Sequence, residues 1–67
     1  MNKELFKQVL EEKRLTHQEI ATALQINLSS LSRKLNTGNF TLKELKVLRQ
    51  LLGIGNVENI FFKKYSK

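Results

Sequence analysis

Cysteine and aspartate are both missing from this chain of 67 residues, and histidine occurs only once, at His17. Without cysteine the chain has no disulfide and no thiolate metal ligand, and one imidazole cannot build a histidine-rich metal site. An enzyme needs a nucleophile or an acid–base pair in a pocket, and here the six acidic residues are glutamates in separate parts of the sequence. We therefore expect a protein that is not an enzyme and that binds no metal, cofactor or small-molecule substrate.

Long hydrophobic runs are missing as well. The longest hold two or three residues, such as Ile60-Phe61-Phe62, whereas a membrane-spanning helix needs about 20. The first residues of the chain are too charged for a signal peptide. These features predict a soluble intracellular protein without a membrane partner.

Proline is also absent, and no segment alternates polar and hydrophobic residues in the manner of a half-buried strand. A chain of this length has room for one domain, which we expect to span residues 1–67 and to end in a frayed basic tail over residues 63–67. Folding at this size buries only about 60% of the surface that the unfolded chain exposes, so the core must be small.

Positive charge dominates the chain, because 12 Lys and Arg residues face six Glu and leave a net charge of +6. Residues 1–26 balance four basic against four acidic side chains, so the excess lies downstream of Ile26. This distribution is typical of a surface that meets a polyanion. A solvated charged surface is the alternative, and charge alone does not separate the two.

Hydrophobic residues recur at helical spacing in five segments, which predicts an all-α bundle of five short helices. The first helix is expected over residues 3–13, with Asn2 as its N-cap. The second is expected to begin at His17, because Thr16 and Glu19 have the spacing of a capping box.

The third predicted helix, residues 28–35, has an unusual composition. Asn27 can cap it, and Leu28, Leu31 and Leu35 fall on one face. The other face crowds serine and arginine, although serine is an indifferent former of helix interiors. These polar side chains therefore indicate a partner outside the core.

A turn over residues 36–39 is predicted to separate this helix from a fourth, over residues 42–52. Thr41 opens a second capping box at the start of the fourth helix. Gly53 is expected to close that helix in a left-handed C-cap, and Asn56 to cap a short fifth helix.

The second and third helices are separated by only three or four residues, so they must cross at a steep angle. Such a crossing requires a small side chain at the contact, and Ala21 meets that need. This helix-turn-helix segment is expected to span residues 16–36. Together with Leu15 before it, it follows the pattern Leu15-Thr16-His17-Gln18-Glu19-Ile20-Ala21-x-x-Leu24-x-Ile26-Asn27-x-Ser29-Ser30-Leu31-Ser32-Arg33. This pattern resembles the helix-turn-helix family of small phage repressors and Cro-like proteins, the lambda-repressor-like DNA-binding domains, and the likeness covers nearly the whole chain.

The resemblance implies a function. It implies a bacteriophage-type transcriptional regulator, a repressor or a Cro-like protein, in the cytoplasm of a bacterial host cell. Such a protein binds double-stranded operator DNA as a homodimer, at least on DNA, and places its third helix in the major groove.

Four side chains of this helix are expected to contact bases. Arg33 is the leading one, because its forked guanidinium can bond the O6 and N7 atoms of a guanine together; a phosphate contact or a surface ion pair is the alternative. Leu28 can pack on a thymine methyl group if it is exposed, whereas its spacing to Leu31 favours partial burial. Ser30 is equally compatible with burial against Ala21 and with a DNA contact. The predicted base-contacting residues are Leu28, Ser29, Ser32 and Arg33.

A larger set of residues is expected to contact phosphate. His17 begins the second helix, where free amides and the helix dipole favour an anion. In relatives the loop after the recognition helix lies along the DNA backbone, where side chains position the protein and do not specify sequence. Lys46 and Arg49 are instead expected on a solvated helix face. The predicted phosphate-contacting residues are Arg14, His17, Gln18, Lys34, Asn36, Thr37, Asn39, Thr41 and Lys43.

Two positions depart from the family pattern. Gln25, near which the second helix should end, stands where glycine usually takes a left-handed conformation. Either this conformation is kept at a cost of about 1 kcal/mol, or the turn has another shape. Lys34 stands where many relatives have a hydrophobic residue, and Leu35 supplies one a step later, so the end of the third helix is open to rotation.

The hydrophobic residues near the C-terminus have two interpretations. They form either a possible dimer interface or the closure of the protein's own core. They also favour, together with Leu28 and Tyr65, a rival function: a protein-binding module on the same fold, such as an antirepressor, a repressor modulator or an antitoxin-like partner. The residues of the possible interface are Val57, Ile60, Phe61 and Phe62.

Overall fold

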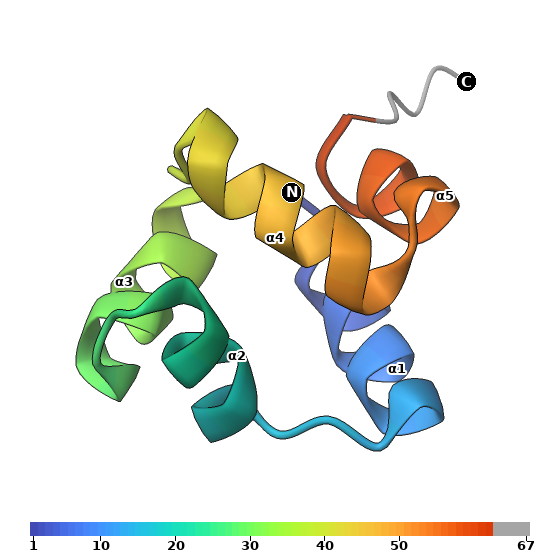
Figure 1. Ribbon diagram of the computed structural model, residues 1–67. Helices are drawn as coiled ribbons and strands as arrows, with labels where there is room; N and C mark the ends of the chain where they lie inside the picture. Colours follow the sequence, from blue (N-terminus) through green and yellow to red (C-terminus); the bar gives the residue numbers. More distant parts are fainter. Residues whose placement is uncertain (63–67) are drawn as a thin grey trace.

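In the part of the chain that the structure describes, five α-helices and one π-helical turn follow one another (Figure 1). The computed structural model describes residues 1–62. These residues contain no strand, so the predicted all-α class is confirmed. Within them, no helix has the length and hydrophobicity that a membrane span requires. The expected frayed tail, residues 63–67, lies outside the described residues. The elements are α1 (Lys3–Lys13), α2 (His17–Leu24), α3 (Leu28–Thr37), α4 (Leu42–Leu52), α5 (Ile54–Val57) and the π-helical turn (Glu58–Phe62).

Each of the first four helices begins with a side-chain cap, as predicted. The Asn2 side chain accepts a hydrogen bond from the Leu5 amide at 3.0 Å. The Thr16 hydroxyl oxygen accepts from the Glu19 amide at 3.1 Å, and the Glu19 carboxylate accepts from the Thr16 amide at 2.8 Å. The start of α4 repeats this reciprocal pair at Thr41, and Asn27 caps α3. These caps satisfy amides that helix geometry leaves unpaired, and they set the residue at which each helix starts.

Three residues connect α2 to α3 in a Schellman motif. Gln25 takes the left-handed conformation, with φ 62° and ψ 39°. Its amide donates to the Thr22 carbonyl at 3.1 Å, and the Ile26 amide donates to the Ala21 carbonyl at 3.0 Å. The left-handed turn is therefore kept without glycine, and Ala21, which is fully buried, lies at the joint.

Replacing Gln25 with glycine should stabilise the fold. A non-glycine residue in the left-handed conformation costs about 1 kcal/mol, and the freedom of glycine in the unfolded chain offsets part of the gain. We expect the free energy of unfolding to rise by about 0.5 kcal/mol or more, as measured by urea unfolding. Ala23→Gly, at an exposed helical position of α2, is the matched control and should destabilise by about 1 kcal/mol. Equal destabilisation by both changes would contradict strain at Gln25.

Two boundaries differ from the prediction. The helix α3 runs past its predicted end to Thr37, and Gly38 then takes the left-handed conformation, with φ 75° and ψ 10°. Gly53 has φ 99° and ψ 144°, which is not the predicted left-handed helical conformation, and α5 begins directly after it. Asn56 is no N-cap, because its side-chain amide donates to the Leu52 carbonyl at 2.7 Å. This bond satisfies a carbonyl at the end of α4, so Asn56 closes the preceding helix instead of opening the next.

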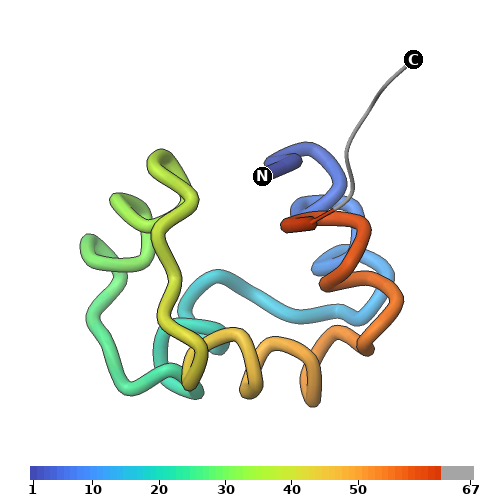
Figure 2. The backbone as a smooth tube through the Cα atoms, turned by 90° about the horizontal axis from the view of Figure 1, so that it is seen from above, coloured from blue at the N-terminus to red at the C-terminus, as the bar shows by residue number. Residues whose placement is uncertain are grey.

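One hydrophobic core receives side chains from every element. Figure 2 shows α3 on one side of the molecule and α1 with α5 on the other, joined by α4. The Asn2 amide donates to the Ile60 carbonyl at 2.8 Å and ties the start of α1 to the π-helical turn. The buried hydrophobic residues are Phe6, Val9, Leu10, Ile20, Ala21, Leu24, Leu31, Leu45, Leu48, Leu52, Val57 and Ile60.

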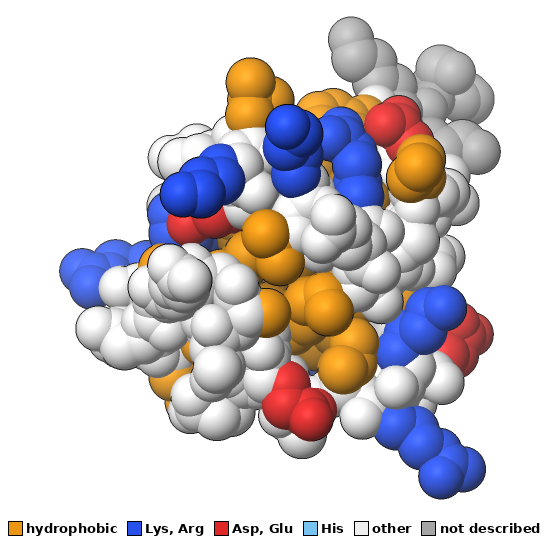
Figure 3. All heavy atoms as spheres, viewed as in Figure 1, with side chains coloured by type: hydrophobic (Ala, Val, Ile, Leu, Met, Phe, Trp, Pro, Cys, Tyr) orange, Lys and Arg blue, Asp and Glu red, His pale blue; other side chains and the backbone are white. Residues whose placement is uncertain are grey.

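Charge is unevenly distributed on the surface. On the face that Figure 3 shows, Lys and Arg side chains gather over α4, with hydrophobic side chains on either side of them. The helix α3 and its connection to α2 contain no acidic residue. Both α3 and α4 therefore present surfaces that an anionic partner can approach.

Candidate functional site

The exposed face of α3 carries the polar side chains on which the predicted site depends. Ser29, Ser32 and Arg33 are exposed, whereas Leu31 is fully buried in the core. Since neighbouring residues of a helix point in different directions, burial of Leu31 sets which side of α3 faces outward. The serine hydroxyls and the guanidinium are thus accessible; their contact with bases stays a prediction.

Leu28, at the first position of α3, has 44% of its surface exposed. A residue with a purely core role would be hidden in the manner of Leu31. Leu28 is therefore exposed, and the partial burial that its spacing to Leu31 favours is not observed.

Asn27 organises the start of α3. Its Oδ1 atom accepts the Ser30 amide at 2.8 Å and the Ser29 hydroxyl at 2.9 Å. Because Ser29 donates its one O–H group to Asn27, the lone pairs of its oxygen remain for an outside donor. In this arrangement the Ser29 hydroxyl can offer an outside partner a hydrogen-bond acceptor but no donor. Ser30 is partly buried, so neither of its two predicted environments applies in full.

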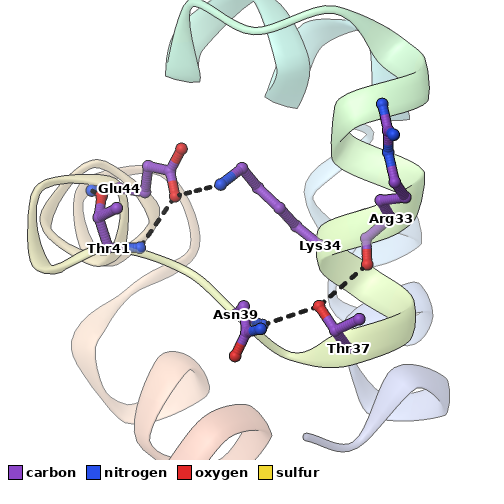
Figure 4. Close-up of polar contacts among 6 residues, drawn as sticks. All are labelled: Arg33, Lys34, Thr37, Asn39, Thr41 and Glu44. Carbon is purple, nitrogen blue, oxygen red and sulfur yellow. Dashed lines mark hydrogen bonds and ion pairs between the residues drawn. The ribbon is translucent and has the colours of Figure 1, made fainter.

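The loop after α3 is held against the last turn of the helix (Figure 4). The Thr37 hydroxyl donates to the Arg33 carbonyl at 3.1 Å, and the Asn39 amide donates to the Thr37 hydroxyl oxygen at 3.3 Å. Two predicted phosphate-contacting residues, Thr37 and Asn39, thereby come together with the predicted base-reading Arg33. A hollow of about 340 Å³ is lined by Ser30, Arg33, Lys34, Thr37 and Asn39.

Lys34 reaches from α3 to α4 (Figure 4). Its Nζ atom lies 3.2 Å from a carboxylate oxygen of Glu44, and the two side chains are only 25% and 13% exposed. The same oxygen accepts the Thr41 amide at 2.9 Å. Glu44 thus balances the charge of Lys34 within the protein, and the phosphate contact of Lys34 stays a prediction. The position at which the resemblance led us to expect a hydrophobic residue here holds an ion pair between two helices.

The ion pair has an effect on the pKa of Glu44. Burial acts to raise the pKa of this carboxyl, but the hydrogen bonds from Thr41 and Lys34 and the charge of Lys34 outweigh burial and leave the pKa below its ordinary value of 4.5. The folded state therefore favours the ionised form more than the unfolded chain does. This contribution to stability is fully present above the ordinary pKa and is lost as the pH falls through the lowered one.

Glu44→Gln should destabilise the protein at neutral pH and lose its effect in acid. Glutamine keeps the capping hydrogen bonds but removes the charge that faces Lys34. We expect a loss of about 1 kcal/mol near pH 7, which shrinks as the pH falls below the ordinary pKa of 4.5 and through the lowered pKa of Glu44. Thermal unfolding of both proteins across this range measures the difference. Glu19→Gln is the control, because the described residues offer Glu19 a capping box but no ion pair. A pH-independent effect of Glu44→Gln would speak against the ion pair.

Thr41 and Lys43 lie where the loop enters α4. The Thr41 hydroxyl oxygen accepts the Glu44 amide at 3.1 Å, so Thr41 serves first as a cap. Lys43 is exposed, and within residues 1–62 no ion pair engages it. The sequence predicts the same phosphate-contacting role for Lys34 and Lys43; within residues 1–62, Lys34 has an ion pair and Lys43 has none.

Three further predicted phosphate contacts, Arg14, His17 and Gln18, lie at the end of α1 and the start of α2. Arg14 is exposed and takes a left-handed conformation after α1, with φ 58°. The His17 ring lies 6.0 Å from the Phe6 ring, and the Gln18 side chain donates to the Thr22 hydroxyl at 3.3 Å. His17 lines a hollow of about 280 Å³ that shares no residue with the one beside Arg33; its lining is Lys3, Glu4, Phe6, Lys7, His17 and Leu35.

Asn36 makes a contact that no local pattern reveals. Its side-chain oxygen accepts a hydrogen bond from the Lys3 ammonium at 3.0 Å, although Lys3 lies 33 positions away, on α1. The contact places the charge of Lys3 beside the loop that follows α3. Lys3 is therefore a cation of the candidate site that the sequence analysis missed, and no spacing signal in the sequence could have found it.

The possible dimer interface requires a correction. Val57 and Ile60 are 0% and 2% exposed, so they belong to the core and have no surface left for a partner. Phe61 is half-buried and packs edge-on against Phe40, with ring centroids 5.2 Å apart. Of the four predicted residues, Phe62 offers the largest accessible area, with 46% of its surface exposed.

No protein-family model, curated protein or solved structure matches this chain. The candidate site consists of an outward helix face with hydroxyls and a guanidinium, a loop that is hydrogen-bonded to the last turn of that helix, and cations at its edges.

Proposed function

We propose that this protein is a sequence-specific DNA-binding transcriptional regulator that places α3 in the major groove of operator DNA. The observation that carries the proposal is the outward face of α3, where Ser29, Ser32 and Arg33 are exposed and no acidic residue lies among them. Hydroxyl groups and a guanidinium fork match the hydrogen-bonding edges of bases in that groove. The positive net charge favours association with the phosphate backbone.

The way in which α3 is held supports the same proposal. The Schellman motif at Gln25 joins α3 to α2 through two backbone hydrogen bonds, and the ion pair of Lys34 with Glu44 joins α3 to α4. Base reading depends on a helix that keeps its orientation, because hydrogen bonds to base edges tolerate little displacement. Thr37 and Asn39 would then lie along the DNA backbone and position the helix.

The regulator would resemble phage repressors and Cro-like proteins in its mode of action. Two copies would bind a roughly palindromic operator, with their α3 helices about 34 Å apart, one turn of DNA. It would repress by steric competition with RNA polymerase.

A protein-binding module is the second candidate function, because Leu28 exposes a hydrophobic surface at the start of α3. Salt dependence separates the two functions. If about six phosphates are neutralised, a plot of the logarithm of the binding constant against the logarithm of the salt concentration should have a slope of about −5. Fluorescence anisotropy of a labelled duplex across a salt series measures the slope. A flat response would favour the protein partner.

A further inference from the structure

We propose that the outer side of α4, together with the start of α5, is a docking surface for an acidic amphipathic protein segment. This is a second binding site, separate from the α3 face, and it does not depend on the proposed DNA binding. We call it the α4 surface; it consists of Leu42, Lys46, Arg49, Gln50, Ile54 and Phe62.

Hydrophobic exposure is the first observation. Leu42 and Ile54 have 77% and 67% of their surface exposed, the highest values among the large hydrophobic residues of the described chain. Neither contributes to the core. Single exposed hydrophobic residues are ordinary, but here Leu42, Lys46 and Arg49 share one face of α4 through their spacing. Figure 3 shows the same arrangement, cations over α4 flanked by hydrophobic side chains.

The second observation is a hollow on this surface. It measures about 550 Å³ and is lined by Lys46, Arg49, Gln50 and Ile54. The Arg49 guanidinium lies 5.8 Å from the centroid of the Phe62 ring, a cation–π distance that brings Phe62 to its edge. Two cations and Ile54 therefore line the hollow, and Phe62 lies close to one of these cations.

The charge of this hollow is compensated only in part. Glu58 approaches Arg49 at 3.9 Å, with side chains that are 54% and 31% exposed, respectively, and such a solvated pair contributes little. Lys46 is exposed and enters no ion pair within the described part of the chain. The α4 surface thus keeps a positive charge beside its hydrophobic residues.

Charge complementarity selects the partner. A second copy of the chain would bring Lys46 and Arg49 against the same cations, with Glu58 alone to offset them. A DNA backbone would satisfy the cations but leave Leu42 and Ile54 against phosphate. A helical segment with leucine at every third or fourth position and glutamate between satisfies both kinds of residue, in the helix-in-groove mode of recognition.

The probe for this proposal is a synthetic amphipathic peptide of about 15 residues, with leucine and glutamate on one face. The control peptide has lysine in place of each glutamate. Binding to the full chain is followed by fluorescence anisotropy and by amide chemical shifts in NMR. We expect the acidic peptide to change the amide chemical shifts of α4 and of the start of α5, and we expect the lysine peptide not to bind. The double variant Leu42→Ser/Ile54→Ser, and separately Lys46→Glu, should each weaken binding about tenfold or more.

The three substituted positions are exposed, so the variants should keep the helical circular dichroism of the parent. Arg33→Ala should bind the acidic peptide as the parent does, whatever its effect on DNA, which separates this site from the proposed α3 site. The proposal is overturned by any of three results: the acidic peptide does not bind, its shifts fall on α3, or the variants leave its affinity unchanged. Self-association of the parent that Leu42→Ser/Ile54→Ser abolishes would assign the surface to a second copy, and would overturn the proposal as well.

Discussion

Arg33→Ala should remove most of the preference of the protein for its operator and spare most of its non-specific binding. One bidentate guanidinium–guanine contact contributes about 1–3 kcal/mol of discrimination, so the ratio of operator to scrambled-duplex affinity should fall about 5- to 150-fold. The side chain is exposed on α3, and no acidic partner engages it in the described residues. Selection from a random duplex pool supplies the operator, and gel shifts on operator and scrambled duplexes measure the ratio.

Lys43→Ala is the matched control for this experiment. Lys43 is also an exposed cation, but it lies at the start of α4, where a phosphate contact is expected. Its loss should weaken binding to both duplexes alike and reduce the magnitude of the salt slope by about 1. Equal losses for Arg33→Ala on the two duplexes would refute base reading and leave Arg33 a phosphate contact.

Ile60→Asp should unfold the protein. Ile60 is 2% exposed, and its neighbours in the core are hydrophobic residues from every element. A carboxylate there loses its hydration and gains no cation, at a cost of about 3–5 kcal/mol. That cost is comparable with the whole stability of a small domain, about 5 kcal/mol or little more. Circular dichroism should therefore show loss of helix at room temperature.

Phe62→Asp is the control for the core substitution, since it introduces the same carboxylate close by in the sequence. Phe62 is 46% exposed, so its aspartate would be hydrated and the helices should remain. A folded Ile60→Asp variant that was a monomer in solution, while the parent was a dimer, would restore the dimer interface that burial of Ile60 argues against.

The starts of the helices were predictable because capping is local. The side chains of Asn2, Thr16, Asn27 and Thr41 each accept from an amide three positions further along, as their spacing to the next hydrophobic stripe indicated. The outward face of α3 was predictable for a similar reason: burial of Leu31 leaves its serine and arginine neighbours in solvent.

The start of α5 was not predictable from such patterns. Asn56 has the residue type of an N-cap, but its side chain finds the Leu52 carbonyl at the end of α4 and bonds there. Gly53 takes a positive φ with an extended ψ, which brings the chain directly into α5. Since one side chain can satisfy either a helix start or a helix end, the residue type alone does not decide between them.

The amino-acid order by itself determined the helical class, the four caps and the polar composition of α3, because each of these depends on residues within a turn or two of one another. The tertiary structure alone decided that Lys34 pairs with Glu44, that Lys3 meets Asn36, and that Val57 and Ile60 close the core. These outcomes join residues on different elements, and only packing of the helices against one another brings such partners within bonding distance.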